Sequence, residues 1–326
     1  MAHVSISRIL HDARRRGYGV ATLWGGNQEK VIGYVRAAES TRSPFIMCYN
    51  RGLCPDIPLE INIPLLVRAA EYADVPAATI LDHATDLDSI KRAIECGVAS
   101  VMFDGSMLPY EENLEKTREV VSYAHARGVD VEAELGAVGG DAEELESQSH
   151  VESTETDPDQ VADFVRRTGI DAIAISFGNT HGKYQGPPRL NYDLVATIAS
   201  RIDIPLVMHG ASGLTLWEYQ RVIESGVSKL NYYTALGLSS GDNLRRRILA
   251  SDEDPVCHKI VKWNIDFVTQ EMTELFKILQ SAGKADDTIG HTPRHRGDAF
   301  DSLAEMLAER VVERIRRETP PTGASS

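Results

Sequence analysis

The sequence predicts an α/β fold, namely a closed (β/α)8 (TIM) barrel with a C-terminal helical extension. Eight short runs rich in apolar and β-branched residues recur between residues 19 and 234. Each of the first seven runs is followed by a segment with apolar residues at three- and four-residue spacing, which is the period of a helix. No GxGxxG motif follows the first run, so the main sequence support for an open dinucleotide-binding sheet is missing.

The predicted strands are nearly continuous apolar runs, which indicates a parallel sheet buried on both faces. They span residues 19–24, 44–49, 77–83, 100–105, 129–136, 172–178, 205–210 and 229–234. Several predicted helices open on Asp, Asn or Thr and several close on Gly, the residue types that cap helices. They span residues 28–41, 61–73, 86–97, 110–128, 157–169, 191–202 and 215–226. Eight strand units of this length fit a closed barrel better than a doubly wound sheet.

Two stretches depart from this alternation. Residues 139–157 are acidic and poor in apolar residues, and in a compact domain we expect such a loop to be functional, as a mobile lid, or disordered. Residues 285–326 hold a polar linker, an amphipathic helix and a Pro/Gly/Ser tail, and the apolar stripe of that helix should pack on its own barrel or on a neighbouring subunit. The predicted organisation is therefore a catalytic barrel over residues 1–284 and an extension over residues 285–326.

Composition and charge exclude several classes of protein. The chain has 326 residues, 42% of them hydrophobic, and a formal net charge of −14, which argues against nucleic acid or an anionic membrane as the main partner. A phosphorylated substrate would therefore need local donors. The four cysteines form no CxxC pair, and no run of about 18 apolar residues or signal-peptide pattern is present. We expect reduced thiols, no membrane span and a cytoplasmic location.

Histidines gather at one rim of the predicted barrel, where the carboxyl ends of the strands carry the active site in this fold. His83 ends the third strand, His181 follows the sixth and His209 ends the seventh. Three imidazoles converging with one position left open are typical of a catalytic zinc site, although each alone reads as an isolated histidine. The other histidines are expected to be solvated on helices or loops: His3, His11, His125, His150, His258, His291 and His295.

Carboxylates accompany these histidines. Asp82 precedes His83, and a twisted strand end could bring both inward, with Asp82 as an acid/base or as support for a ligand. Asp104 and Glu134 are candidate metal ligands, or partners that orient the ligands, or members of a salt bridge at the barrel mouth. Glu132 shares the parity of Glu134, so we expect it to face the barrel interior lower down.

Glycine-rich turns follow the sixth and seventh strands and contain Gly182, Gly210 and Ser212. Backbone N–H groups freed by glycine can approach an anion closely, and the loops after strands seven and eight commonly bind phosphate in such barrels. Asn231 and Thr234, on the eighth strand, complete this candidate phosphate site.

Four blocks of the sequence, in the same order, resemble the class II (metal-dependent) ketose-bisphosphate aldolases, the fructose- and tagatose-bisphosphate aldolase family. They are residues 81–140 (LDHATD to AELGAVGG), 177–214 (FGNTHG to MHGASGL), 226–237 (GVSKLNYYTALG) and 275–285 (LFKILQSAGKA). The resemblance implies a lyase that reversibly cleaves a phosphorylated ketose to dihydroxyacetone phosphate and an aldehyde.

The resemblance also assigns a metal set. His83, His181 and His209 match the zinc ligands of the family, and Asp104 and Glu134 match carboxylates near a second or alternate metal position. Another divalent ion could replace zinc. The glycines at positions 182 and 213 match the place where the family often binds a monovalent cation, Na⁺ or K⁺.

Substrate roles follow in the same way. Asp82 matches the acid/base that exchanges a proton with the C4 hydroxyl, and Glu143 or Glu144 on the acidic loop would protonate the new carbanion. The groups that match those holding the dihydroxyacetone phosphate half are Gly182, Gly210, Ser212, Asn231 and Thr234. The implied partners are a small phosphorylated sugar and a second or further copy of the chain, as a homodimer or homotetramer.

Departures from the family pattern concern the aldehyde half of the pocket. Trp24, Tyr49 and Arg51 stand where the family has small polar residues, and Gly210-Ala211 replaces a double glycine. We hypothesise that the cleaved ketose differs from fructose 1,6-bisphosphate in its aldehyde portion. Two alternatives remain: a metal-dependent barrel isomerase or hydrolase acting on a sugar phosphate, and a catalytically silent scaffold.

Overall fold

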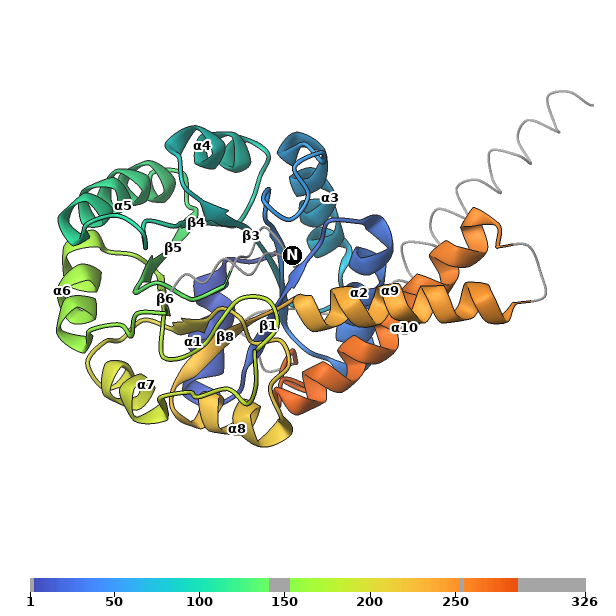
Figure 1. Cartoon of the computed structure of the whole chain (residues 1–326). Helices are drawn as coiled ribbons and strands as arrows, with labels where there is room; N and C mark the ends of the chain where they lie inside the picture. The colour runs from blue at the N-terminus through green and yellow to red at the C-terminus, as the bar shows by residue number, and fades with distance from the viewer. Residues whose placement is uncertain (1–2, 141–152, 252–254, 287–326) are drawn as a thin grey trace, which may run out of the picture. The chain divides into compact units, whose positions relative to one another are not determined.

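Eight parallel strands close into a barrel in sequence order, with β1 hydrogen-bonded to β8 (Figure 1). The computed structural model describes residues 3–140, 153–251 and 255–286. The strands are β1 (Val20–Trp24), β2 (Phe45–Tyr49), β3 (Ala77–Ala84), β4 (Ser100–Phe103), β5 (Asp130–Leu135), β6 (Ala172–Ile175), β7 (Leu206–Met208) and β8 (Val227–Tyr232). The predicted (β/α)8 barrel is confirmed, and all eight predicted strands are present.

Helices alternate with the strands and form the outer layer of the barrel (Figure 1). They are α1 (Ile6–Arg16), α2 (Gln28–Thr41), α3 (Leu59–Tyr72), α4 (Leu87–Glu95), α5 (Tyr110–His125), α6 (Pro158–Thr168), α7 (Tyr192–Ala199), α8 (Leu216–Glu224), α9 (Thr234–Ala250) and α10 (Cys257–Ile278). The side chains of Asn27, Asp86, Asp157, Asn191 and Thr215 cap five of them by accepting a backbone N–H. These caps place the first turns of the outer helices close to the predicted positions.

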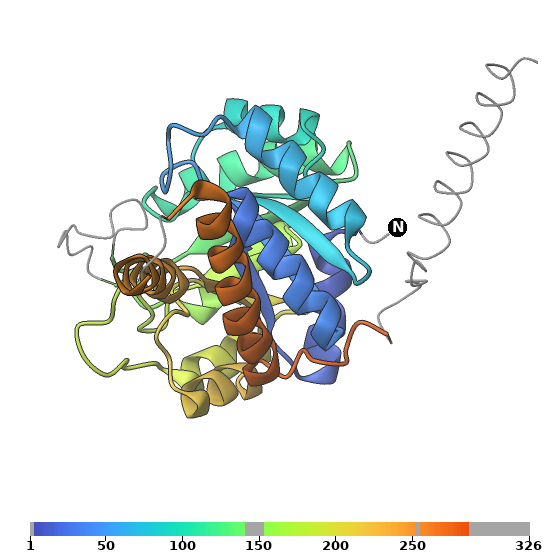
Figure 2. The same ribbon diagram turned by 90° about the vertical axis from the view of Figure 1, so that its right-hand side faces the viewer.

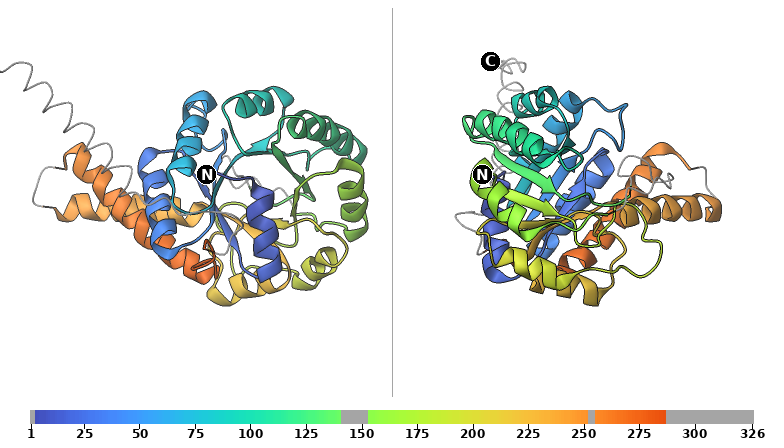
Figure 3. Two further views of the ribbon diagram at one scale, coloured as in Figure 1. Left: turned by 180° about the vertical axis from the view of Figure 1, so that it is seen from behind. Right: turned by 60° about the vertical axis from the view of Figure 1, so that its left-hand side comes forward.

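Helix α1 covers the amino end of the barrel, and the sequence analysis did not predict it (Figure 3, left). Its buried Ile6, Ile9 and Leu10 pack in one cluster with interior residues of the strands such as Val20 and Ile46. The barrel is therefore filled from below by apolar side chains, and only the carboxyl end of the strands is open for chemistry.

Helices α9 and α10 follow β8, and α10 runs alongside α2 (Figure 2). A Cβ at Gly33 on α2 would lie 2.6 Å from Val268 of α10, so glycine permits this close approach. The block resembling the last barrel helix, residues 275–285, is the end of α10 and the turn after it. The amphipathic helix predicted within residues 285–326 lies outside the described residues.

The prediction for His3 was wrong. His3 pairs with the start of β3, and its Nε2 lies 2.9 Å from Oγ1 of Thr79. Burial lowers its pKa below the ordinary value for histidine, with a weaker opposing effect from Glu71. His11, His125 and His258 are exposed as predicted, and the remaining three lie outside the described residues. None of the helices in the described part of the chain is long and apolar enough to cross a membrane.

Candidate metal centre

A register shift in β3 brings two consecutive residues into the barrel mouth. Leu81 pairs with Val101 and Ala84 with Phe103, so β3 has one residue more than β4 over this stretch. His83 takes up the extra residue with φ of 51°, a left-handed conformation that is uncommon outside glycine. In a regular strand, neighbours point to opposite faces. Here Asp82 and His83 line the same pocket, as the twisted strand end predicted.

The three predicted histidines meet at this pocket. Nε2 of His83 lies 2.8 Å from Nδ1 of His209, and Nε2 of His181 lies 3.4 Å from the same atom. Two ligand nitrogens of a tetrahedral zinc ion are about 3.3 Å apart, given Zn–N bonds of about 2.0–2.1 Å. One nitrogen from each of the three rings therefore lies at about the distance from its neighbours that the ligands of a single metal ion have.

The other ring nitrogens of His83 and His209 are held by carboxylates. Nδ1 of His83 lies 2.7 Å from Oδ2 of Asp104, and Nε2 of His209 lies 3.2 Å from Oε1 of Glu132. An N–H on each of these nitrogens leaves the opposite nitrogen with a free lone pair directed at the cluster. This arrangement is the usual support for metal-binding histidines. The donor set therefore fits a divalent cation.

Negative charge exceeds positive charge around the imidazoles. Burial opposes protonation of His83, yet Asp82, Asp104 and Glu134 together raise its pKa to about 10. Burial and then Asp104 raise the pKa of Glu134 to about 8, while burial and the charge of His83 lower that of His209. Oδ1 of Asp82 and Oε2 of Glu134 are buried without a hydrogen-bond partner among the described residues. A bound cation would supply the missing positive charge and partners.

Below the histidines lies a buried ion pair that the sequence analysis only half anticipated. Glu132 faces the interior as predicted, fully buried, and Nζ of Lys229 donates to both of its carboxylate oxygens. The signal for Lys229 that the prediction left unused is a lysine on a strand expected to be buried on both faces, where it needs a charged partner. The pair holds Glu132 against His209.

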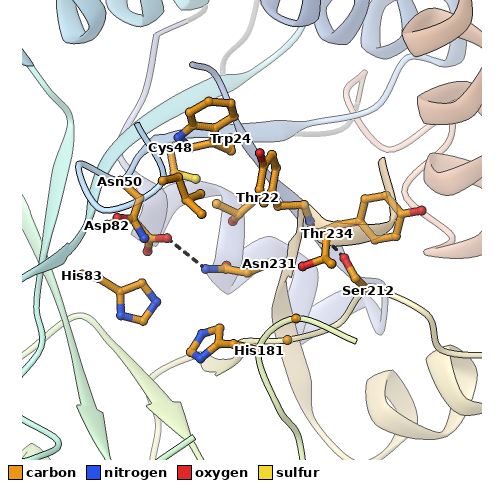
Figure 4. Close-up of a pocket in the computed structure, with 15 residues that line it drawn as sticks. Thr22, Trp24, Cys48, Asn50, Asp82, His83, His181, Ser212, Asn231 and Thr234 are labelled. Atoms are coloured by element: carbon orange, nitrogen blue, oxygen red, sulfur yellow. Dashed lines mark hydrogen bonds between the residues drawn. The ribbon is translucent and has the colours of Figure 1, made fainter. Parts of the chain in front are cut away.

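The predicted phosphate groups line the same pocket on the β6, β7 and β8 side. Gly182, Gly210, Ser212, Asn231 and Thr234 all contribute to it. Figure 4 shows Ser212 and Thr234 on one side of the pocket and His83 on another, with Asn231 between. Asn231 donates from Nδ2 to Oδ2 of Asp82 at 3.4 Å.

Glycine is required at one of these positions for a steric reason. Gly210 has φ of 66°, and a Cβ there would lie 1.9 Å from the carbonyl oxygen of Thr180. Gly182, with φ of 79°, has open space where its Cβ would be, so its backbone is accessible from the pocket. The predicted loop acid Glu143 and its neighbour Glu144 lie outside the described residues.

A family model described as fructose-bisphosphate aldolase class-II matches residues 4–284 of this chain. The chain belongs to this family. The resemblance on which the sequence analysis rested is therefore confirmed, and the histidine cluster is where the class II aldolase family is expected to bind its metal.

Relatives within the class II aldolase family cover most of the chain. The fructose-bisphosphate aldolase of Geobacillus stearothermophilus is 35% identical over 291 residues, which are 87% of this chain and 99% of that protein. Protein YdjI of Escherichia coli K12 is 37% identical over 228 residues, or 69% of this chain and 81% of YdjI. The crystal structure of the YdjI aldolase superposes with a TM-score of 0.77 at 31% identity, covering 87% of this chain and 99% of YdjI.

The side chains that depart from the family pattern have different positions. Trp24 lines the metal pocket, whereas Tyr49 is fully buried and its Oη donates to the carbonyl of Ile57. Arg51 lines an adjoining cavity of about 270 Å³ that shares Asp82 and His83 with the first. Tyr49 lines that adjoining cavity as well, so all three side chains border space that a substrate could occupy.

Proposed function

We propose that this aldolase reversibly cleaves a phosphorylated ketose to dihydroxyacetone phosphate and an aldehyde, using zinc held by His83, His181 and His209. The observation that carries the proposal is the convergence of one nitrogen from each of these rings beside Asp82. Asp104 and Glu134 are proposed as an alternate position for the metal, because they form a second possible ligand group with His83.

A divalent cation bound by the three imidazoles supplies positive charge that polarises a carbonyl and stabilises the negative charge left by carbon–carbon cleavage. Asp82 is proposed to take the proton of the C4 hydroxyl. In support, one of its oxygens accepts from Asn231 and the other has no hydrogen-bond partner among the described residues. Loss of that proton allows the C3–C4 bond to break. Proton return to C3 is proposed for Glu143 on the acidic loop.

The phosphate would be held by neutral donors. Backbone N–H groups near Gly182 and Gly210, with the hydroxyls of Ser212 and Thr234, surround that side of the pocket. Such donors bind an anion without requiring net positive charge. This suits a chain whose overall charge of −14 would repel a phosphorylated sugar. A monovalent cation near Gly182 and Gly213 is proposed as an additional contributor.

The first experiment follows release of dihydroxyacetone phosphate from a panel of ketose phosphates, with metal removed by a chelator and then restored. We expect cleavage that is lost with the metal, returns with zinc, and is greater for a ketose other than fructose 1,6-bisphosphate. The aldolase should also exchange one C3 proton of dihydroxyacetone phosphate with tritiated water. Metal-dependent hydrolysis or isomerisation without that exchange would contradict the proposal and support the alternative enzymes.

Metal content gives a second test. His181→Ala and His209→Ala should each lose zinc on gel filtration, whereas the exposed-histidine control His258→Ala should retain it. Cleavage that persists in both site variants would contradict the assigned ligands. We propose a homodimer or homotetramer, which sedimentation velocity would distinguish from a monomer.

A further inference from the structure

Trp24 is an unusual residue for the wall of this pocket. It ends β1, is 6% exposed, and lines the same cavity as His83 and His181. Figure 4 places its ring across the pocket from His181. Its indole Nε1 is buried and has no hydrogen-bond partner among the residues that the structure describes. An unmet N–H lowers stability, which suggests that a ligand supplies the acceptor.

The indole ring is fixed by its surroundings. A Cβ at Gly26 would lie 1.9 Å from the ring, so glycine leaves the space that the ring fills. Tyr233 contacts the ring edge-on with centroids 4.9 Å apart, and Nζ of Lys30 lies 5.0 Å from the centroids of both rings. A donor held in this way is preorganised for an acceptor and loses little freedom on binding.

The position of Trp24 indicates which part of the substrate it meets. The phosphate donors Ser212 and Thr234 lie on the β7 and β8 side, whereas Trp24 and Cys48 lie together at the ends of β1 and β2 (Figure 4). Asp82, proposed to act on the C4 hydroxyl, lies on β3, next to the end of β2 that carries Cys48. Carbons beyond the cleaved bond would therefore extend toward Trp24.

We propose that Trp24 is a specificity-determining residue whose indole N–H donates a hydrogen bond to an oxygen on the aldehyde half of the ketose. This inference rests on the proposed aldolase function. Lys30 and Tyr233 are positioning residues, because they hold the ring and need not contact the substrate.

The chemistry of this wall defines the class of aldehyde. Trp24 packs in one cluster with Cys48, Leu53 and Tyr233, and the polar side chains of Thr22 and Asn50 line the pocket beside this cluster. Lys30 adds positive charge beside it, with no carboxylate partner among the described residues. An oxygen on the carbon next to the aldehyde carbonyl accepts the hydrogen bond from the indole N–H of Trp24, whereas an alkyl group leaves that N–H without an acceptor. The expected aldehydes are therefore hydroxylated.

The experiment measures aldol synthesis from dihydroxyacetone phosphate and matched aldehydes, with the zinc-loaded protein. Glycolaldehyde is compared with acetaldehyde, and glyceraldehyde with propionaldehyde and with glyceraldehyde 3-phosphate. We expect wild type to prefer the hydroxylated member of each pair in kcat/KM, and Trp24→Phe, which keeps an aromatic ring but removes the N–H, to lower that preference about tenfold. Glyceraldehyde 3-phosphate shows whether a phosphate can supply the oxygen.

Matched variants separate this role from a structural one. Gly26→Ala should displace the ring and Lys30→Met should loosen it, so both should lower the preference; Trp217→Phe, whose indole is 60% exposed, should not. Exchange of the C3 proton of dihydroxyacetone phosphate needs no aldehyde and should remain at the wild-type rate in Trp24→Phe.

The outcomes are distinguishable. An unchanged preference in Trp24→Phe, or a loss of proton exchange in it, overturns the assignment of Trp24 to the aldehyde half. Absence of proton exchange in wild type instead overturns the proposed function itself.

Discussion

Lys229 donates from Nζ to both carboxylate oxygens of Glu132, at 2.9 and 2.8 Å, with both side chains fully buried. The residues are on β8 and β5, and Glu132 also contacts Nε2 of His209. This pair thus fixes one imidazole of the metal centre from beneath. A buried carboxylate can be tolerated there because its charge is matched.

Replacing Lys229 by Met should destabilise the protein by about 3–5 kcal/mol, because Glu132 is left as a buried, unpaired charge. Urea unfolding of the metal-free protein measures this loss. The double variant Lys229→Met/Glu132→Leu should recover much of the stability, but it should bind zinc more weakly, since His209 has lost its acceptor. Equal stability of wild type and Lys229→Met would contradict the role of the pair.

Asp82→Asn should reduce ketose cleavage by about 100- to 10,000-fold, because an amide cannot take the C4 hydroxyl proton. Zinc content and exchange of the C3 proton of dihydroxyacetone phosphate should remain, since neither uses that proton. Stopped assays on the same preparation measure the rate of ketose cleavage and the rate of C3 proton exchange. Asp203→Asn, at an exposed carboxylate, is the control and should leave both rates unchanged.

Lys30 predicts a dependence of stability on alkaline pH. Burial lowers its pKa from 10.5 to about 8, so between these values the unfolded chain holds a proton that the folded chain has lost. Stability of wild type relative to Lys30→Met should therefore rise with pH across that window, by up to about 3 kcal/mol. Tyr34 and Tyr233, which lie nearby, have pKa values raised by burial.

Denaturant unfolding at about pH 7.5, 9 and 10.5 samples the pH range below, within and at the upper end of this window. It measures the difference in the free energy of unfolding between wild type and Lys30→Met. Lys262→Met, whose side chain is 72% exposed, should show no such slope relative to wild type. A flat difference between wild type and Lys30→Met would show that Lys30 keeps an ordinary pKa in the folded protein.

Two glycines that follow β7 should respond differently to alanine. Gly213 has φ of 89° and no atom within 4 Å of the point that a Cβ would occupy, so Ala there should cost about 1–2 kcal/mol through backbone strain alone. At Gly210 the new Cβ would meet the carbonyl of Thr180, so the chain before His181 must move. Gly210→Ala should therefore also weaken zinc binding, measured by competition with a chromogenic chelator, whereas Gly213→Ala should not.

Local patterns in the sequence predicted most of the barrel. Alternating strand and helix periods are encoded by neighbouring residues, so the strands and the helices from α2 to α8 were found near their observed ends. Helix α1 was missed because its role, covering the amino end of the barrel, depends on side chains from several strands. His3 was misassigned for the same reason, since its partner Thr79 is 76 residues away.

The candidate site was predictable as a set of residues but not as an arrangement. The order of the strands in a barrel places His83, His181 and His209 at one rim, and the sequence by itself determined that much, together with the family. Only the tertiary structure decided which ring nitrogen of His83 and of His209 faces the cluster, that Lys229 neutralises Glu132, and that Trp24 leaves its N–H unmet. The physical reason is that strand order follows from the chain, whereas ring orientation, charge balance and hydrogen-bond satisfaction depend on atoms that meet only after the barrel closes.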